Sequence, residues 1–123
     1  MGFKLRPPYS DEEMNTPVYR VDEEDGINGR ANKNGTITLN NKLNPNEEEN
    51  TISHEMTHVK QFKDFNESEG KKGLDYSDDH ISWNGKNYKR KNGKIFYEGK
   101  WRPEGWPKFP WEEEAYNNET PIT

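Results

Sequence analysis

Apolar side chains recur at helical spacing in the middle of the chain. Successive apolar positions here are separated by steps of four, three and three residues, which places them on one face of a helix. A helix with one such face packs that face against a core. The positions concerned are Ile52, Met56, Val59, Phe62 or Lys63, and Phe65.

The same segment carries signals for the start and the end of this helix. Asn44 is a favourable N-cap, Pro45 fits the first helical position, and Glu47 completes a capping box. Downstream, Gly70 is a typical helix terminator. We therefore predict one long helix from Pro45 to about Asn66.

Two short strands are predicted before the helix. Segment 16–21 alternates only loosely and stops at an acidic run, so it favours a short strand. Segment 36–40 alternates clearly, because Ile37 and Leu39 point to the same face, as a half-buried strand requires. The second strand leads directly into the long helix.

After the helix, short aromatic strands alternate with glycine turns. Asn-Gly pairs between alternating aromatic residues are a strong signal for β-hairpins. We predict a two- or three-stranded β-meander over residues 80–101, irregular structure over 102–110, where three prolines occur, and a short helix from Trp111. The glycine turns are Asn84-Gly85, Asn92-Gly93 and Glu98-Gly99.

These elements fit one small α+β domain spanning residues 1–123. Only 27% of the 123 residues are hydrophobic, but 15 are aromatic, which favours a small core rich in large rings. Residues 1–16 contain prolines and acidic side chains, so we expect a loose arm there. The last residues, from Glu119 to Thr123, are expected to fray.

Net charge, cysteine content and the length of apolar runs limit the partners and metal ligands that we expect. The net charge of −5 makes nucleic acid an unexpected partner for the chain as a whole. Cysteine is absent, so a metal site must use His and carboxylate ligands. No apolar run has the length of a signal peptide or a membrane span, so we expect a soluble protein that does not contact a membrane.

The long helix contains the sequence His54-Glu55-Met56-Thr57-His58, which is H-E-x-x-H. Histidines four residues apart leave the same helical face, so both rings can reach one zinc ion. Glu55 lies beside that site, where a carboxylate can take a proton from a water molecule that the metal activates. The pattern predicts a Zn²⁺ site with Glu55 as general base and then acid.

A catalytic zinc site needs a third protein ligand, and the residues leave three candidates open. Asp64 lies six residues after His58, but Gln61 occupies the position where this spacing requires glycine. His80 is the only other histidine. The third candidate is a glutamate of the acidic triplet Glu112-Glu113-Glu114 near the C-terminus.

Two motifs resemble those of known zinc peptidases. H-E-x-x-H followed later by Glu112-Glu-Glu-Ala115 resembles the gluzincin class, to which thermolysin belongs, where a glutamate in an E-x-x-A motif on a later helix completes the site. The stretches His58-Val-Lys-Gln61 and Pro110-Trp-Glu-Glu-Glu-Ala115 are also similar to small phage-encoded and bacterial H-E-x-x-H proteins. Together the motifs cover about a fifth of the chain.

The resemblance implies a minimal zincin-like fold, with a small sheet, an active-site helix, a meander insert and a short C-terminal helix. It makes His54, His58 and Glu112 the zinc ligands and Glu55 the catalytic base, with Glu113 as second choice to Glu112. The oxyanion donor must come from the chain itself, with His80 and Tyr116 ahead of three other tyrosines. Those three are Tyr76, Tyr88 and Tyr97.

We therefore expect a zinc metallopeptidase acting on a peptide or protein, in the host cytoplasm or with a virion. Peptidoglycan stem peptides, virion proteins and host proteins are the substrate classes left open.

The alternative is a zincin-like binding module with a structural metal. Between Ser82 and Pro110 there are eight basic residues against two acidic ones, a local charge of +6, which such a module would use to contact an anionic or protein partner. Protection of sheet edges by lysine is the simpler interpretation of these charges.

Overall fold

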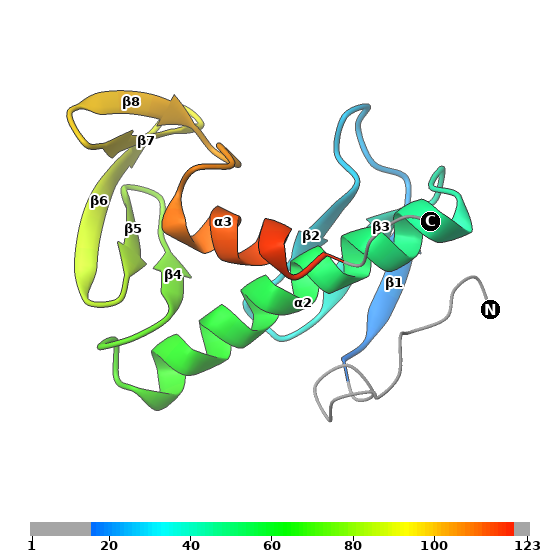
Figure 1. Cartoon of the computed structure of the whole chain (residues 1–123), viewed down its shortest axis with the longest axis horizontal. Coiled ribbons are helices and arrows are strands. Elements are labelled where there is room, and N and C mark those ends of the chain that lie inside the picture. The colour runs from blue at the N-terminus through cyan, green and yellow to red at the C-terminus, as the bar shows by residue number, and fades with distance from the viewer. Residues whose placement is uncertain (1–15, 120–123) are drawn as a thin grey trace. The chain divides into compact units, whose positions relative to one another are not determined.

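The structure, a computed structural model, describes residues 16–119 (Figure 1). The expected arm, apart from Thr16, and the residues after Glu119 lie outside this range. The described residues contain two helices and eight strands, which confirms the α+β class. In chain order these are β1 (Val18–Val21), β2 (Gly29–Ala31), β3 (Ile37–Asn40), α2 (Pro45–Glu67), β4 (Leu74–Tyr76), β5 (His80–Trp83), β6 (Lys86–Lys91), β7 (Lys94–Tyr97), β8 (Lys100–Pro103) and α3 (Pro110–Asn117).

The described residues form two compact units. The first contains residues up to Val59 together with those from Ala115 onward, and the second contains Lys60–Glu114. Helices α2 and α3 each contribute residues to both units.

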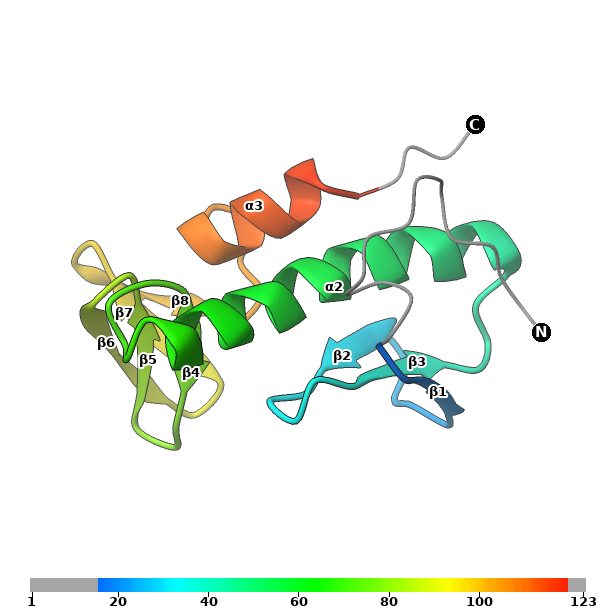
Figure 2. The same cartoon turned by 90° about the horizontal axis from the view of Figure 1, so that it is seen from below.

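The first unit is a three-stranded sheet with the first half of α2 across one face (Figure 2). The strand order is β1-β3-β2, with β1 parallel and β2 antiparallel to β3. Ile37 and Leu39 are fully buried and pack with Ile52, Met56 and Val59 of α2. The predicted stripe is therefore confirmed, and the strand before the helix supplies the other half of this core.

The start of α2 has the predicted capping box. The Glu47 backbone N–H donates to Asn44 Oδ1 at 2.8 Å, and the Asn44 N–H donates to Glu47 Oε1 at 3.0 Å. A part-buried ion pair also joins this end of α2 to β1, because Arg20 Nε lies 2.6 Å from Glu48 Oε2. That hydrogen bond raises the pKa of Arg20. Local capping and a long-range ion pair thus fix the same end of the helix.

The second unit is built on a five-stranded antiparallel meander with the order β4-β5-β6-β7-β8. Its hairpin turns use the predicted glycine pairs, and the residue before each glycine has a positive φ, 48° at Asn84, 53° at Asn92 and 48° at Glu98. Positive φ at both central positions defines the tight turn that suits a two-residue hairpin. The prediction of hairpins is confirmed.

The meander is longer than predicted. Strand β4 was not expected, and β8 reaches Pro103, so residues 102 and 103 are regular rather than irregular. Proline is tolerated there because β8 is an edge strand, and an N–H on its outer side has no neighbouring strand to donate a hydrogen bond to. Helix α3 begins at Pro110, one residue earlier than predicted.

Aromatic rings fill the core of the second unit. Phe109 and Trp111 stack at 4.7 Å between ring centroids, and Tyr97 meets Phe109 edge-on at 5.4 Å. Tyr88 packs against both Tyr97 and Trp111, at 5.3 and 5.9 Å. These contacts seat the first turn of α3, where Trp111 is 2% exposed, in the core of this unit.

Candidate metal centre

The two motif histidines lie one turn apart on α2, as the spacing predicts. Their ring centroids are 5.1 Å apart and the ring planes make an angle of 73°. His58 is buried and His54 is half-buried, so both rings are largely withdrawn from solvent.

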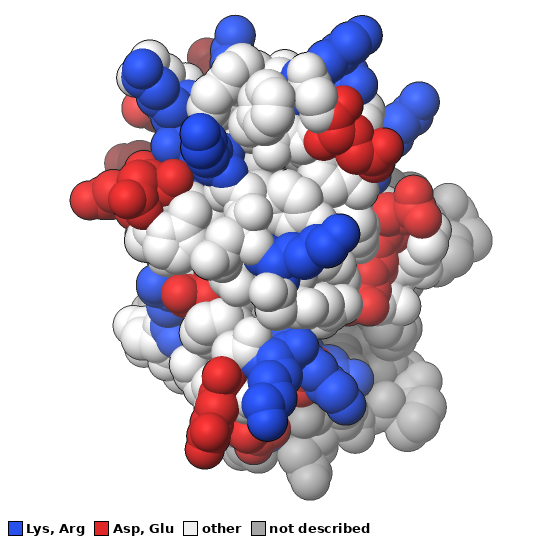
Figure 3. Space-filling view, turned by 90° about the vertical axis from the view of Figure 1, so that its left-hand side faces the viewer, with Lys and Arg blue, Asp and Glu red and all other residues white. Residues whose placement is uncertain are grey.

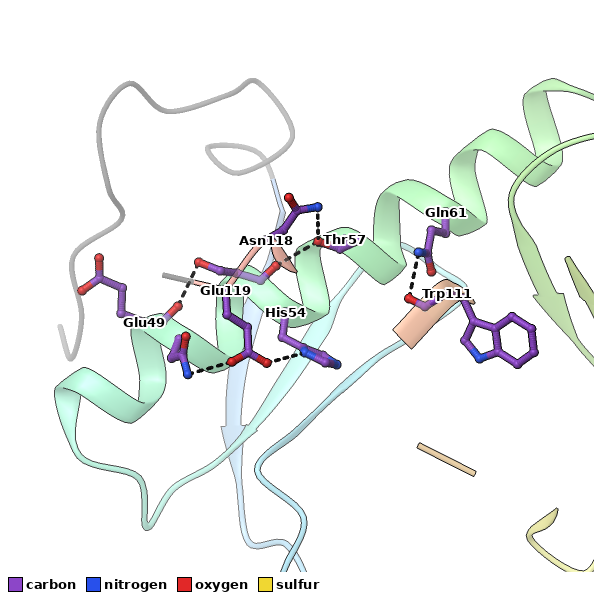
Figure 4. Close-up of polar contacts among 9 residues, drawn as sticks. Glu49, His54, Thr57, Gln61, Trp111, Asn118 and Glu119 are labelled. Carbon is purple, nitrogen blue, oxygen red and sulfur yellow. Dashed lines mark hydrogen bonds and ion pairs between the residues drawn. The ribbon is translucent and has the colours of Figure 1, made fainter. Parts of the chain in front are cut away.

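A carboxylate that the sequence did not single out orients the first histidine. His54 Nδ1 lies 2.7 Å from Glu119 Oε2, and Asn50 Nδ2 donates to the other carboxylate oxygen at 3.0 Å (Figure 4). An Nδ1–H that donates to a carboxylate places the lone pair on Nε2, the nitrogen that then can bind a metal. The expected fraying from Glu119 is therefore wrong at that residue, because two side chains of α2 hold it.

Glu112 is the third member of a group that could hold a metal ion. The ligand atoms of His54, His58 and Glu112 all lie within 4.8 Å of one another. Donors bound at about 2.1 Å to a single ion are at most about 4.2 Å apart, so the three are already near the spacing that one ion requires. Two imidazoles and one carboxylate form a donor set that zinc prefers, and these residues therefore fit a zinc ion.

Gln61 holds the first turn of α3, from which Glu112 projects. Gln61 is 2% exposed, and its Nε2 donates to the Trp111 carbonyl at 3.1 Å (Figure 4). The same nitrogen donates to Glu114 Oε1 at 3.0 Å. Because Trp111 directly precedes Glu112, these hydrogen bonds fix the backbone next to the ligand. Gln61 lies three residues after His58, where the resemblance to H-x-x-Q proteins had already singled it out without giving it a role.

The last turn of α3 is also tied to α2. Asn118 Nδ2 donates to Thr57 Oγ1 at 3.4 Å, and Ala115 is fully buried. The Tyr116 ring centroid lies 4.6 Å from that of His54 in an edge-on arrangement, although 46% of Tyr116 remains exposed. Tyr116 thus lies beside a candidate ligand and is partly exposed to solvent.

The other third-ligand candidates are not part of this group. His80 Nδ1 lies 2.7 Å from both Ser77 Oγ and Asp79 Oδ1, and its hydrogen bond is the main cause of the lowered pKa of Asp79. Asp64 lies on a helix that continues to Glu67, and Glu113 is exposed. Among residues 16–119, the triad with Glu112 is the only such group of three.

The remaining named residues have mixed surroundings. Glu55 follows His54 on α2 and is half-buried. Tyr88 and Tyr97 belong to the aromatic core of the second unit, and burial together with a hydrogen bond to Glu98 raises the pKa of Tyr97. Tyr76 packs against Phe62 and lies under the Arg90 guanidinium. In the structure, these three tyrosines pack against other side chains.

Comparison with known protein families, with curated proteins and with solved structures found no match. Among the described residues, neither helix has the length and apolar character needed to cross a membrane.

Proposed function

We propose that the protein is a zinc-dependent metallopeptidase. The observation that carries this proposal is the convergence of two helix-borne imidazoles and one carboxylate, with a glutamate next to the first histidine in the chain. Three protein ligands leave a fourth position for water, which is the arrangement of catalytic rather than structural zinc sites. When bound, the metal lowers the pKa of water and polarises the carbonyl of the scissile bond.

The chain supplies the proton transfers. Glu55 takes a proton from the attacking water as the new C–O bond forms, and then gives that proton to the amide nitrogen as the C–N bond breaks. The proton balance closes, because the carboxylate is regenerated when the amine leaves. Glu119 keeps His54 in one tautomer and orientation throughout, so the ligand does not reorganise during the reaction.

Tyr116 is the better supported of the two oxyanion donors. Its ring lies beside His54 and is partly exposed, whereas His80 has its Nδ1 engaged by Ser77 and Asp79. A phenolic O–H that donates to the developing oxyanion stabilises the transition state more than the ground state. The substrate is a peptide or protein segment, with peptidoglycan stem peptides among the classes to be tested.

The test compares cleavage of a mixed peptide library and denatured casein by the wild-type protein and by Glu55→Gln, with products identified by mass spectrometry. The substitution keeps the shape of the side chain but removes the base, so turnover should fall by about a hundredfold or more while zinc stays bound. The matched control is Glu67→Gln, an exposed glutamate at the end of the same helix, which should cleave normally. Wild-type turnover by Glu55→Gln would exclude the mechanism.

Bound zinc without cleavage of any peptide would instead favour the alternative, a zincin-like module in which the metal holds the fold and another surface contacts a partner.

A further inference from the structure

One face of the meander carries lysines and exposed aromatic rings. Paired residues of neighbouring strands point to the same face, and Lys91 pairs with Lys94 while Phe96 pairs with Trp101. Lys89 joins them because side chains two apart on a strand share a face. We call Lys89, Lys91, Lys94, Phe96 and Trp101 the lysine-aromatic face. Tyr88, Ile95 and Tyr97 point to the opposite, packed face.

Edge protection does not explain these lysines. Lysine on an edge strand keeps sheets from pairing, but β6 and β7 are interior strands in the order β4-β5-β6-β7-β8. Lys91 and Lys94 lie directly opposite each other, and like charges at such positions destabilise a sheet. Within residues 16–119, these three lysines form no ion pair, so a polyanion could supply the missing countercharge.

The two aromatic rings are exposed where burial is expected. Phe96 and Trp101 keep 39% and 44% of their surface in solvent and contact each other edge-on at 5.3 Å. Figure 3 views the molecule from the side of these strands and shows Lys and Arg interspersed with Asp and Glu on a largely uncharged surface. Cations combined with accessible rings on a sheet form a surface that neutralises phosphates and stacks bases.

We propose that the lysine-aromatic face binds single-stranded nucleic acid, with the lysines on backbone phosphates and the ring of Trp101 or Phe96 stacked on bases. The net charge of the whole chain argues against such a partner, but the local field decides binding, and Lys89, Lys91 and Lys94 place three positive charges on this face. Single strands are favoured over duplex because only unpaired bases offer their faces for stacking. This inference does not depend on the proposed peptidase activity.

The test is fluorescence anisotropy of the full chain with a labelled oligothymidylate of about 16 nucleotides, at about 50 and 200 mM salt. Binding should weaken as salt rises. Trp101→Ala should weaken it by about tenfold or more, as expected for the loss of one stacked base. Lys91→Ala should also reduce the slope of log affinity against log salt by about 0.7.

Matched control variants are available outside the meander. Tyr19 is 56% exposed on β1, so Tyr19→Ala removes an exposed ring of similar accessibility outside the proposed surface. Lys42→Ala likewise removes an exposed lysine from the loop before α2. Both should bind as the wild type does, and Trp101→Phe should recover most of the binding lost in Trp101→Ala.

Three results would overturn the proposal. They are no binding at the lower salt concentration, affinity unchanged in Trp101→Ala while its circular dichroism spectrum shows a native fold, and equally tight binding of heparin or of a duplex of the same length. The last result would mark a general polyanion surface without base stacking.

Discussion

The two helices that carry the candidate ligands hold them by different means. On α2, the spacing between His54 and His58 follows from the helix itself, so backbone hydrogen bonds alone bring the rings together. On α3, Glu112 depends on side-chain hydrogen bonds from Gln61, a residue about fifty positions earlier in the chain. The histidine pair is therefore a local feature, and the third ligand is a tertiary one.

The candidate site is therefore most sensitive to changes at α3. A change that leaves α2 intact keeps the histidine pair, but the candidate third ligand is displaced when the first turn of α3 shifts.

Gln61→Leu should have the largest effect on the α3 side. Leucine has a similar size but cannot donate, so the Trp111 carbonyl loses a hydrogen bond in a buried place. Unfolding free energy, measured by urea denaturation, should fall by about 1–3 kcal/mol. Zinc affinity, measured by competition with a chromophoric chelator, should fall as well, although both histidines are unchanged. Unaltered zinc affinity would mean that Glu112 is positioned without Gln61.

Glu119→Gln acts on the orientation of a ligand instead of its place in the fold. The amide can still accept a hydrogen bond from His54 but has no charge to favour the metal-binding tautomer. Zinc affinity should fall by about 10- to 100-fold, as is typical for such outer partners. The unfolding free energy of the metal-free protein should change much less than in Gln61→Leu. Glu67→Gln provides a control, because it removes the same charge from an exposed glutamate at the C-terminal end of α2.

Asn44→Ala tests whether the histidine pair depends only on the part of α2 around it. It removes the side-chain acceptor of the capping box at the start of α2, about three turns before the histidines. The unfolding free energy should fall by about 1 kcal/mol, the usual cost of losing an N-cap. Zinc affinity of the folded protein should stay within about twofold, because the helix around His54 remains intact. A large loss of affinity would show that the histidine pair is not locally determined.

Features with a local cause could be predicted from the sequence. The capping box, the apolar stripe and the glycine turns each depend on residues a few positions apart, and all three have the predicted form in the structure. The pairing of the two motif histidines belongs to this group. The choice of Glu112 came from a resemblance to known motifs, and the spacing alone left Asp64 and His80 open.

Features with a tertiary cause were missed. Strand β4 is only three residues long, which is too short to show a period, and it exists because β5 pairs with it. Glu119 meets His54 across 65 residues of sequence, and no local pattern marks that contact. The lysines of β6 and β7 suggested edge strands, and only the strand order reveals that both strands lie inside the sheet.

We propose that residues of two helices together hold one zinc ion. Elemental analysis of protein purified without a metal-binding tag measures this directly, in the wild type and in His58→Ala, Glu112→Ala and Glu113→Ala. We predict about one zinc per chain in the wild type and in Glu113→Ala, whose exposed side chain lies outside the triad, and loss of zinc in the other two. No zinc in the wild type after reconstitution, or full zinc in Glu112→Ala, would contradict the account.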